Sequence, residues 1–304
     1  MKAAFYPIFT LLAAPLLPGI INRTKAFFAG RRGPPLLQMY YDLWKLLRKE
    51  SVYSRTTTWV FLAGPLIALA AALVLPLMTP MGNLPALCAF PGDILLWIYI
   101  LGLWRFLTVL AALDTGSSFE GMGASREMFF GFFAELPFVL GIVALAYYRG
   151  DFMLSHLFSR QVAVPVEWAL HLPLLLLIGS AWFVVALAEN ARIPVDDPNT
   201  HLELTMIHEV LILDHGGPEL AGLLYAANIK LWLYLSLLVN LFFPIYSSHL
   251  LYNGLVFAGG MLLVTMLVGV VESAWARLRL PRVPQLLLGA TALAFVALLL
   301  AIGP

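Results

Sequence analysis

The sequence predicts an all-α integral membrane protein of about eight membrane-spanning helices, with amphipathic helices on the cytoplasmic side and both termini on the outer side. The chain has 304 residues, of which 61% are hydrophobic and only 12% are charged. A soluble domain usually has about 25% charged residues. The mean hydropathy is +0.88, and apolar stretches long enough to cross a bilayer, about 20 residues each, recur along the chain.

Eight stretches reach this length, and together they predict a single membrane domain over residues 1–304. We expect helices, because backbone groups in lipid must be hydrogen-bonded within their own segment. The stretches are residues 3–22, 58–79, 93–113, 127–148, 167–188, 219–244, 254–273 and 284–302. The first resembles a signal peptide in composition, but no A-x-A-like cleavage site follows it, so we interpret it as a retained helix.

The basic residues predict which side of the membrane each loop faces. The odd-numbered loops, at 23–57, 114–126, 189–218 and 274–283, hold most of the 18 lysines and arginines. The even-numbered loops contain only Arg149 and Arg160. An excess of Lys and Arg marks cytoplasmic loops, so the odd loops are expected to face the cytoplasm across a prokaryotic inner membrane.

The first of these loops contains a predicted amphipathic helix after the turn GRRGPP. Its apolar positions recur at helical spacing, and its charged positions lie on another face. The apolar set is Leu37, Tyr40, Tyr41, Trp44 and Leu47, and the charged set is Asp42, Lys45 and Lys49. Such a helix lies on the membrane surface or docks a partner, and the pattern leaves both open.

A few ionisable residues lie inside the predicted spans or near their ends, among them Arg105, Glu135, Lys230 and Glu272. A charge at the bilayer centre costs about 2.5–3.5 kcal/mol on insertion scales, so such residues usually pair, line a cavity or carry a function. Interhelical ion pairs that only fix packing are one interpretation. For Glu135 we favour proton handling, because Pro137 nearby removes a backbone donor and can open a polar cavity.

The segment HLELTMIHEVLILDHGGP, residues 201–218, gathers histidines and carboxylates in an apolar chain. Thr200 and Glu203 fit a capping box, and the glycines before Pro218 end the segment, so a short helix is predicted over 200–214. A metal site is not predicted, because His201 and His208 would lie roughly 10.5 Å apart on such a helix. The pattern also differs from the H-E-x-x-H zinc helix.

We interpret this region instead as a hydrated acidic funnel that exchanges protons and leads into the bilayer at Glu135. Histidine titrates close to physiological pH, which suits such a surface. The expected members are Glu189, Asp196, Asp197, Glu203, His208, Glu209 and Asp214. A solvated loop that conducts nothing is the alternative.

Four segments in order along the chain resemble subunit 1 of respiratory complex I. They are similar, more closely, to the homologous membrane subunit of group 4 membrane-bound nickel–iron hydrogenases and formate hydrogenlyases. The segments are GRRGPPLLQMYYDLWKLLRKESV (30–52), DTGSSFEGMGASREMFFGFFAELP (114–137), ALAENARIPVDDPNTHLEL (186–204) and VESAWARLRLPRVPQ (271–285). Three features favour the hydrogenase branch over a quinone-binding one. The first loop is shorter, Asn199 and His201 replace two acids, and Glu272 is present.

The resemblance implies a non-redox subunit that anchors a soluble arm and carries the first stretch of an H⁺ or Na⁺ path. The implied partners are a hydrogenase-like large subunit, an iron–sulfur small subunit and antiporter-like membrane subunits. The positions that match the family's ion path are Glu135, Glu189, Asp196 and Glu203. We add Lys230 and Glu272 because they lie inside a predicted span or at its end. Expected docking or structural positions are Arg31, Arg32, Gly33, Pro34, Asp42, Lys45, Arg126 and Arg277.

No cofactor is expected in this chain. Its one cysteine, Cys88, cannot supply the roughly four thiolates of an iron–sulfur cluster. Iron–sulfur clusters, and a nickel–iron centre, are expected in other subunits. The net charge of +1 gives no indication of nucleic-acid binding.

Three alternatives stay open at this point. The first is the quinone-binding subunit 1 of an NADH dehydrogenase-type complex. The second is an independent secondary transporter, which usually shows an inverted repeat that we do not find. The third is an intramembrane hydrolase, which needs a nucleophile–base pair or a metal set at depth, and neither is evident.

Overall fold

A computed structural model describes residues 5–82, 84–158, 168–197, 206–243 and 249–303, and these residues are helical or lie in connecting segments. Within these ranges the structure contains no β-strand, only one isolated bridge between Met81 and Leu84. The helices are α1 Phe5–Ala13, α2 Leu16–Phe28, α3 Gln38–Leu47, α4 Trp59–Met78, α5 Asp93–Asp114, α6 Ser118–Arg149, α7 Leu154–Phe158, α8 Trp168–Glu189, α9 Gly217–Phe242, α10 Leu250–Ala274 and α11 Val283–Ile302. The all-α prediction is confirmed.

Seven helices in the described part of the chain are long and apolar enough to cross a membrane. The pair α1 and α2 passes the same test as one span that is bent by 47°. Pro15 lies at this break, where a residue without a backbone N–H cannot continue the hydrogen-bond ladder. The count of about eight spans is therefore confirmed, with the first one broken and extended to Phe28.

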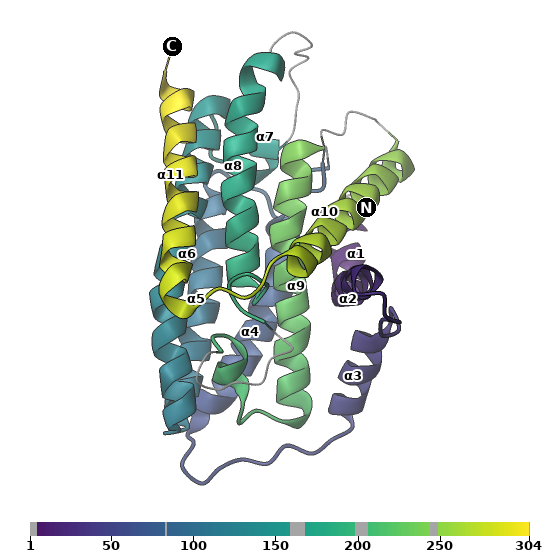
Figure 1. The fold of residues 1–304 in the computed structure, drawn as a ribbon, viewed down its shortest axis with the longest axis vertical. Coiled ribbons are helices and arrows are strands. Elements are labelled where there is room, and N and C mark those ends of the chain that lie inside the picture. The colour runs from purple at the N-terminus through teal and green to yellow at the C-terminus, as the bar shows by residue number, and fades with distance from the viewer. Residues whose placement is uncertain (1–4, 83, 159–167, 198–205, 244–248, 304) are drawn as a thin grey trace.

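The spanning helices form an elongated bundle (Figure 1). Helix α11 packs against α6 and α8, and α4 packs against α5 and α9. Helix α10 packs against α2 and runs obliquely to the upright helices in Figure 1. Cys88 is exposed in the segment that connects α4 and α5.

Helix α3 confirms the amphipathic helix predicted in the first loop. It packs against α9 and α2. Tyr41, Trp44 and Leu47 nevertheless remain exposed. The two roles expected for this face, contact with the membrane surface or with a partner, both stay predictions.

Helix α6 is longer than the predicted span of 127–148, because it begins at Ser118. With a rise of about 1.5 Å per residue, its 32 residues exceed the thickness of a hydrocarbon core. An apolar pattern indicates only the part inside the membrane and misses the polar first turns, where Glu120 is buried.

The predicted helix over 200–214 is wrong for its described part. Residues 198–205, with Thr200, His201 and Glu203, lie outside the described residues. Met206 to His208 are not helical, and Glu209–Ile212 form a 3₁₀ turn. The Asp196 carboxylate accepts the N–H groups of Ile207 at 3.1 Å and His208 at 3.2 Å, so these amides are not available for a helix.

Candidate functional site: a charged cluster beside a cavity

Arg105, on α5, is the centre of a buried ion-pair cluster. Its Nε lies 3.3 Å from Glu127 Oε1. Its Nη1 contacts Glu135 and its Nη2 contacts Glu189. Helix α6 supplies Glu127 and Glu135, and the last residue of α8 supplies Glu189. Two helices, α6 and α8, thus deliver three carboxylates to one guanidinium on α5.

Gly131 provides the space for this arrangement. A Cβ atom built on it would lie 2.8 Å from Arg105 Cζ and 2.9 Å from its Nε. The absence of a side chain lets the guanidinium cross the surface of α6 between Glu127 and Glu135. A glycine in a helix interior costs about 0.5–1 kcal/mol relative to alanine, so this position favours the ion pairs over helix propensity.

The ion pairs continue in two directions from Arg105. Lys230, on α9, lies with Nζ 2.8 Å from Glu189 Oε2. His208 Nε2 lies 3.3 Å from Glu127 Oε2. His208 Nδ1 lies 3.5 Å from Asp196 Oδ2, on its other side.

Arg277 closes the far end of the series, because its Nη2 donates to Asp196 Oδ1 at 2.8 Å. We call the whole set the Arg105 cluster: Arg105, Glu127, Glu135, Glu189, Asp196, His208, Lys230 and Arg277. It joins α5, α6, α8 and α9 to the parts of the fifth loop that hold Asp196 and His208.

The net charge of the Arg105 cluster depends on whether His208 is protonated. Its three arginine and lysine cations face four carboxylates, so the sum is −1 with His208 neutral and zero with His208 protonated. Burial opposes a charge on His208, but Glu127 and Asp196 outweigh it, and the pKa of His208 is raised. Burial also opposes the Asp196 anion, yet His208 and Arg277 lower the pKa of Asp196. His208 is therefore a favourable place for the balancing proton.

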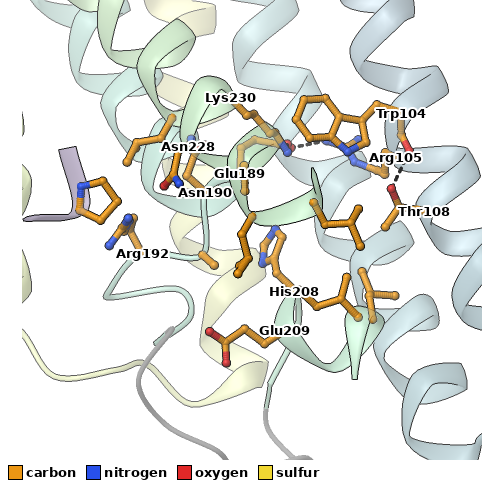
Figure 2. A pocket seen from close by; sticks show the side chains of 18 of the residues that line it. Trp104, Arg105, Thr108, Glu189, Asn190, Arg192, His208, Glu209, Asn228 and Lys230 are labelled. Atoms are coloured by element: carbon orange, nitrogen blue, oxygen red, sulfur yellow. Dashed lines mark hydrogen bonds and ion pairs between the residues drawn. The ribbon is translucent and has the colours of Figure 1, made fainter. Parts of the chain in front are cut away.

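A cavity of about 310 Å³ lies beside the Arg105 cluster. Figure 2 shows Arg105, Glu189, His208 and Lys230 around it, with Trp104 next to Arg105. The lining also contains the polar residues Asn190, Arg192, Glu209 and Asn228 and the apolar residues Leu101, Leu223, Leu224 and Leu231. A cavity lined by both charged and apolar side chains can hold water or the polar head of an amphipathic molecule.

Glu272 belongs to a separate buried cluster. Its carboxylate is fully buried, with Lys25 Nζ 2.8 Å from Oε2 and Arg192 Nη1 3.6 Å from Oε1. A Cβ atom on Gly269 would lie 2.7 Å from Thr24 Cβ, so α10 and α2 approach closely here. Glu272 therefore fastens α10 to α2 and to the residue Arg192 of the cavity wall.

The structure brings only part of the predicted acidic funnel together. Glu209 lines the cavity. Asp197 has a half-buried side chain, and its backbone N–H donates to Asp196 Oδ1 at 3.0 Å. Asp214 is exposed, and its N–H donates to Glu120 Oε1 at 3.3 Å, away from the cavity-lining residues. Glu203 lies outside the described residues.

Three of the predicted docking or structural residues make contacts within the chain. Arg126 donates to the Met206 carbonyl at 2.9 Å, and Arg277 binds Asp196. Asp42 accepts a hydrogen bond from Gln38 at 2.9 Å within α3.

The remaining predicted docking residues lie at the surface of the first loop. Arg31, Arg32, Pro34 and Lys45 are exposed. Gly33 lies against α2, because a Cβ atom added to it would lie 3.0 Å from Ala26 Cβ.

Glu127 is the main functional candidate that the sequence interpretation missed. It lies eight residues before Glu135, about two helical turns away and on the same face. This spacing could have identified Glu127 from the sequence, because Arg105 needs carboxylate partners at membrane depth.

His215 is a second residue with an unusual environment, outside the Arg105 cluster. It is buried and stacks on Phe61, with ring centroids 3.9 Å apart. Burial lowers the pKa of His215 to about 4, although Glu219 and Asp214 act in the opposite sense. His215 is thus a neutral packing residue at pH 7.

Residues 1–302 match the protein family described as NADH dehydrogenase. Formate hydrogenlyase subunit 4 of Escherichia coli K12 is 31% identical to this chain over 316 residues, which cover 98% of the chain and 100% of that protein. Hydrogenase-4 component C of the same strain is 29% identical over 276 residues, 89% of the chain and 85% of that protein. A subunit of the NADH-quinone oxidoreductase of Rubrobacter xylanophilus is 29% identical over 178 residues, 58% of the chain and 52% of that protein.

A solved structure has the same fold. It is that of the membrane-bound sulfane sulfur reductase, an archaeal respiratory membrane complex, and one of its chains matches with a TM-score of 0.83. The match covers 99% of this chain and 98% of that chain at 22% sequence identity, which supports likeness of fold alone.

Proposed function

We propose, because this chain belongs to the NADH dehydrogenase family, that it is the non-redox membrane subunit of an energy-converting, complex I-like oxidoreductase. The hydrogenase or formate hydrogenlyase type is favoured. The relatives from that branch align over almost the whole chain, whereas the match to the NADH-quinone oxidoreductase subunit covers 58% of it. The resemblance to the family is confirmed by the match over residues 1–302.

In this proposal, electron transfer in an attached soluble arm drives H⁺ or Na⁺ movement through the Arg105 cluster. The observation that carries the proposal is the charge imbalance of a largely buried set of ion pairs. An uncompensated buried charge costs about 3–5 kcal/mol, so the cluster binds a balancing proton or cation. A displacement of the segment that holds Asp196 and His208 would change that balance and release the ion.

The proposed sidedness places the first, third, fifth and seventh loops in the cytoplasm and both termini outside. The excess of basic residues in these loops supports it. The soluble partners would then be a hydrogenase-like large subunit and an iron–sulfur small subunit, with Arg31, Arg32 and Lys45 available at the surface to contact them. Antiporter-like subunits would continue the path within the membrane.

The redox centres of the complex would lie in those partners. Iron–sulfur clusters and a nickel–iron centre fit the hydrogenase branch. This chain would contribute protein side chains only, because a single thiol cannot hold such a cluster.

The test uses the whole complex in inverted membrane vesicles, with ion translocation and electron transfer measured in parallel. Glu127→Gln should abolish most translocation per electron while the complex stays assembled, because it removes an anion that binds both Arg105 and His208. Asp214→Asn is the matched control, since this carboxylate is exposed and not among the cavity-lining residues. Full translocation by both Glu127→Gln and Glu135→Gln in an assembled complex would refute the proposed role of the cluster.

Mass spectrometry of the gently purified complex tests the partners separately. A nickel–iron large subunit, an iron–sulfur small subunit and antiporter-like proteins are expected. A chain that purifies alone and transports ions without them would support the secondary-transporter alternative instead.

A quinone-binding role is the second candidate, and the cavity favours it. Its volume of about 310 Å³ is at the lower end of ligand pockets, about 300–1,000 Å³. Photolabelling of the purified complex with an azido-quinone distinguishes the two. Quinone-protected labelling of cavity residues such as Met39 or Leu224 would favour this role, and unprotected or absent labelling would exclude it.

A further inference from the structure

The outward face of α6 carries one carboxylate within a stripe of apolar side chains. Met128, Phe132, Val139 and Val143 are exposed by 48%, 59%, 38% and 39%. Glu135 lies between them, and the spacings of three and four residues place all five on one face of the helix. The side chain of Glu135 is 49% exposed.

This carboxylate differs from the others in the Arg105 cluster. The side chains of Glu127 and Glu189 are only 8% and 4% exposed. Arg105 contacts Oε1 of Glu135, and no described residue donates a hydrogen bond to Oε2. If lipid covered this face, an ionised oxygen would be turned toward hydrocarbon, at a cost of about 2.5–3.5 kcal/mol near the bilayer centre.

Helix α11 offers a comparison, because its exposed face has the composition expected of a lipid-facing surface. It has no ionisable residue between Val283 and Ile302. Its exposed side chains include Leu288, Leu293, Phe295 and Leu299. The face of α6 around Glu135 has the same apolar background with a charge added, which is typical of a contact between membrane proteins rather than a contact with lipid.

The charge of the cluster indicates what the partner must offer. With His208 neutral, the Arg105 cluster sums to −1. A basic side chain beside Glu135 Oε2 would bring the sum to zero once His208 has released its proton, and it would satisfy the free oxygen. Arg105 approaches from inside the bundle, so the outer side of the carboxylate remains for the partner.

We propose that the stripe formed by Met128, Phe132, Glu135, Val139 and Val143 docks a transmembrane helix of another subunit. That helix presents a lysine, arginine or histidine to Glu135. The inference rests on the proposed function, because it places the next group of the ion path on the partner. Glu135 is then the contact through which this chain exchanges ions with its neighbour.

The first experiment places a photoreactive phenylalanine analogue at Phe132, one turn from Glu135, in the intact complex. The matched control carries the analogue at Phe295 on α11, which is 49% exposed. We expect position 132 to crosslink to a helix of a membrane subunit that contains a basic residue, and position 295 to crosslink to lipid. Crosslinking of position 132 to lipid alone, or to a helix without a basic residue, overturns the proposal.

The second experiment reverses the charges. Glu135→Lys should lower retention of the crosslinked subunit through purification by about tenfold or more, which requires a loss of only about 1.4 kcal/mol. Exchange of the identified basic residue for glutamate should restore retention. Absence of any rescue, with the chain still folded by its circular dichroism spectrum, contradicts the pairing.

The two proposals can fail independently. If Glu135→Gln abolishes translocation while position 132 meets only lipid, the path through the cluster stands and the docking proposal falls. If position 132 crosslinks to a basic membrane helix while Glu127→Gln and Glu135→Gln both pump fully, the interface stands and the proposed ion path falls.

Discussion

Substitution of Gly131 by alanine perturbs the Arg105 cluster without removing any of its charges. The new Cβ atom would lie 2.8 Å from Arg105 Cζ, whereas ordinary contacts begin at 3.4 Å. The guanidinium must therefore retreat by at least about 0.6 Å, unless α6 itself moves; retreats of this kind in packed interiors usually cost about 1–3 kcal/mol.

The ion pairs give a second estimate of the same magnitude. With an effective dielectric constant of about 20, lengthening the Arg105 Nε–Glu127 distance of 3.3 Å by about 0.6 Å weakens that pair by about 0.8 kcal/mol. The Glu189 pair is equally buried, and the half-exposed Glu135 pair contributes less. The sum is about 1–2 kcal/mol.

Gly102→Ala on α5 is the control, because no atom lies within 4 Å of the Cβ that it adds. Both substitutions gain the helix propensity of alanine, about 1 kcal/mol. Unfolding of the purified protein in mixed detergent micelles, followed by circular dichroism, should show Gly131→Ala to be about 1–3 kcal/mol less stable than Gly102→Ala. Equal stability of the two variants, with equal ion translocation, would refute the packing argument for Gly131.

Three further predictions concern buried charge. His208→Gln should flatten the loss of thermal stability as pH rises above the ordinary histidine pKa of about 6.5. A histidine whose pKa is raised by folding stabilises the folded state below the pKa that it has in the unfolded chain, and this effect is lost as pH rises through the pKa of the folded state. Identical slopes in thermal melts would count against this prediction. His215→Phe should keep the stack on Phe61. The wild type should lose stability as pH falls from about 6.5 toward 4, because its unfolded state binds more protons than its folded state in this range, and the variant should lack this loss. Thermal melts at about pH 5 and 7 test this. Lys25→Met should destabilise the protein by about 3 kcal/mol, because it leaves Glu272 buried with a more distant cation; the double variant with Glu272→Gln should recover most of this in a mutant cycle, and strictly additive losses would argue against a coupled pair.

The sequence predicted the spans well where apolarity alone decides their limits. The predicted stretch 58–79 corresponds to Trp59–Met78, and 284–302 corresponds to Val283–Ile302. It failed where a tertiary contact decides, as in the fifth loop, where the Asp196 carboxylate binds the amides of Ile207 and His208. A capping pattern in the sequence contains no information about such a distant acceptor.

The candidate site was predicted in its residue types but not in its connections. Arg105, Glu135 and Glu189 were expected as charges at membrane depth or as matched positions, and the structure brings them together. Glu127 was missed because the face of α6 that meets Arg105 depends on how α5 and α6 pack. Arg277 was expected as a docking or structural residue, and its contact with Asp196 crosses from the seventh loop to the fifth, a proximity that only the fold creates.

The lone thiol of Cys88, exposed between α4 and α5, makes the unaltered chain a reporter of its own topology. A membrane-impermeant maleimide can react with it from one side of the bilayer only. Labelling in cells with a permeabilised outer envelope, with protection in inverted vesicles, would assign that loop to the outer face without any engineered residue. The same tag, once attached, offers a fixed optical reference point on the opposite side of the membrane from the proposed docking loops.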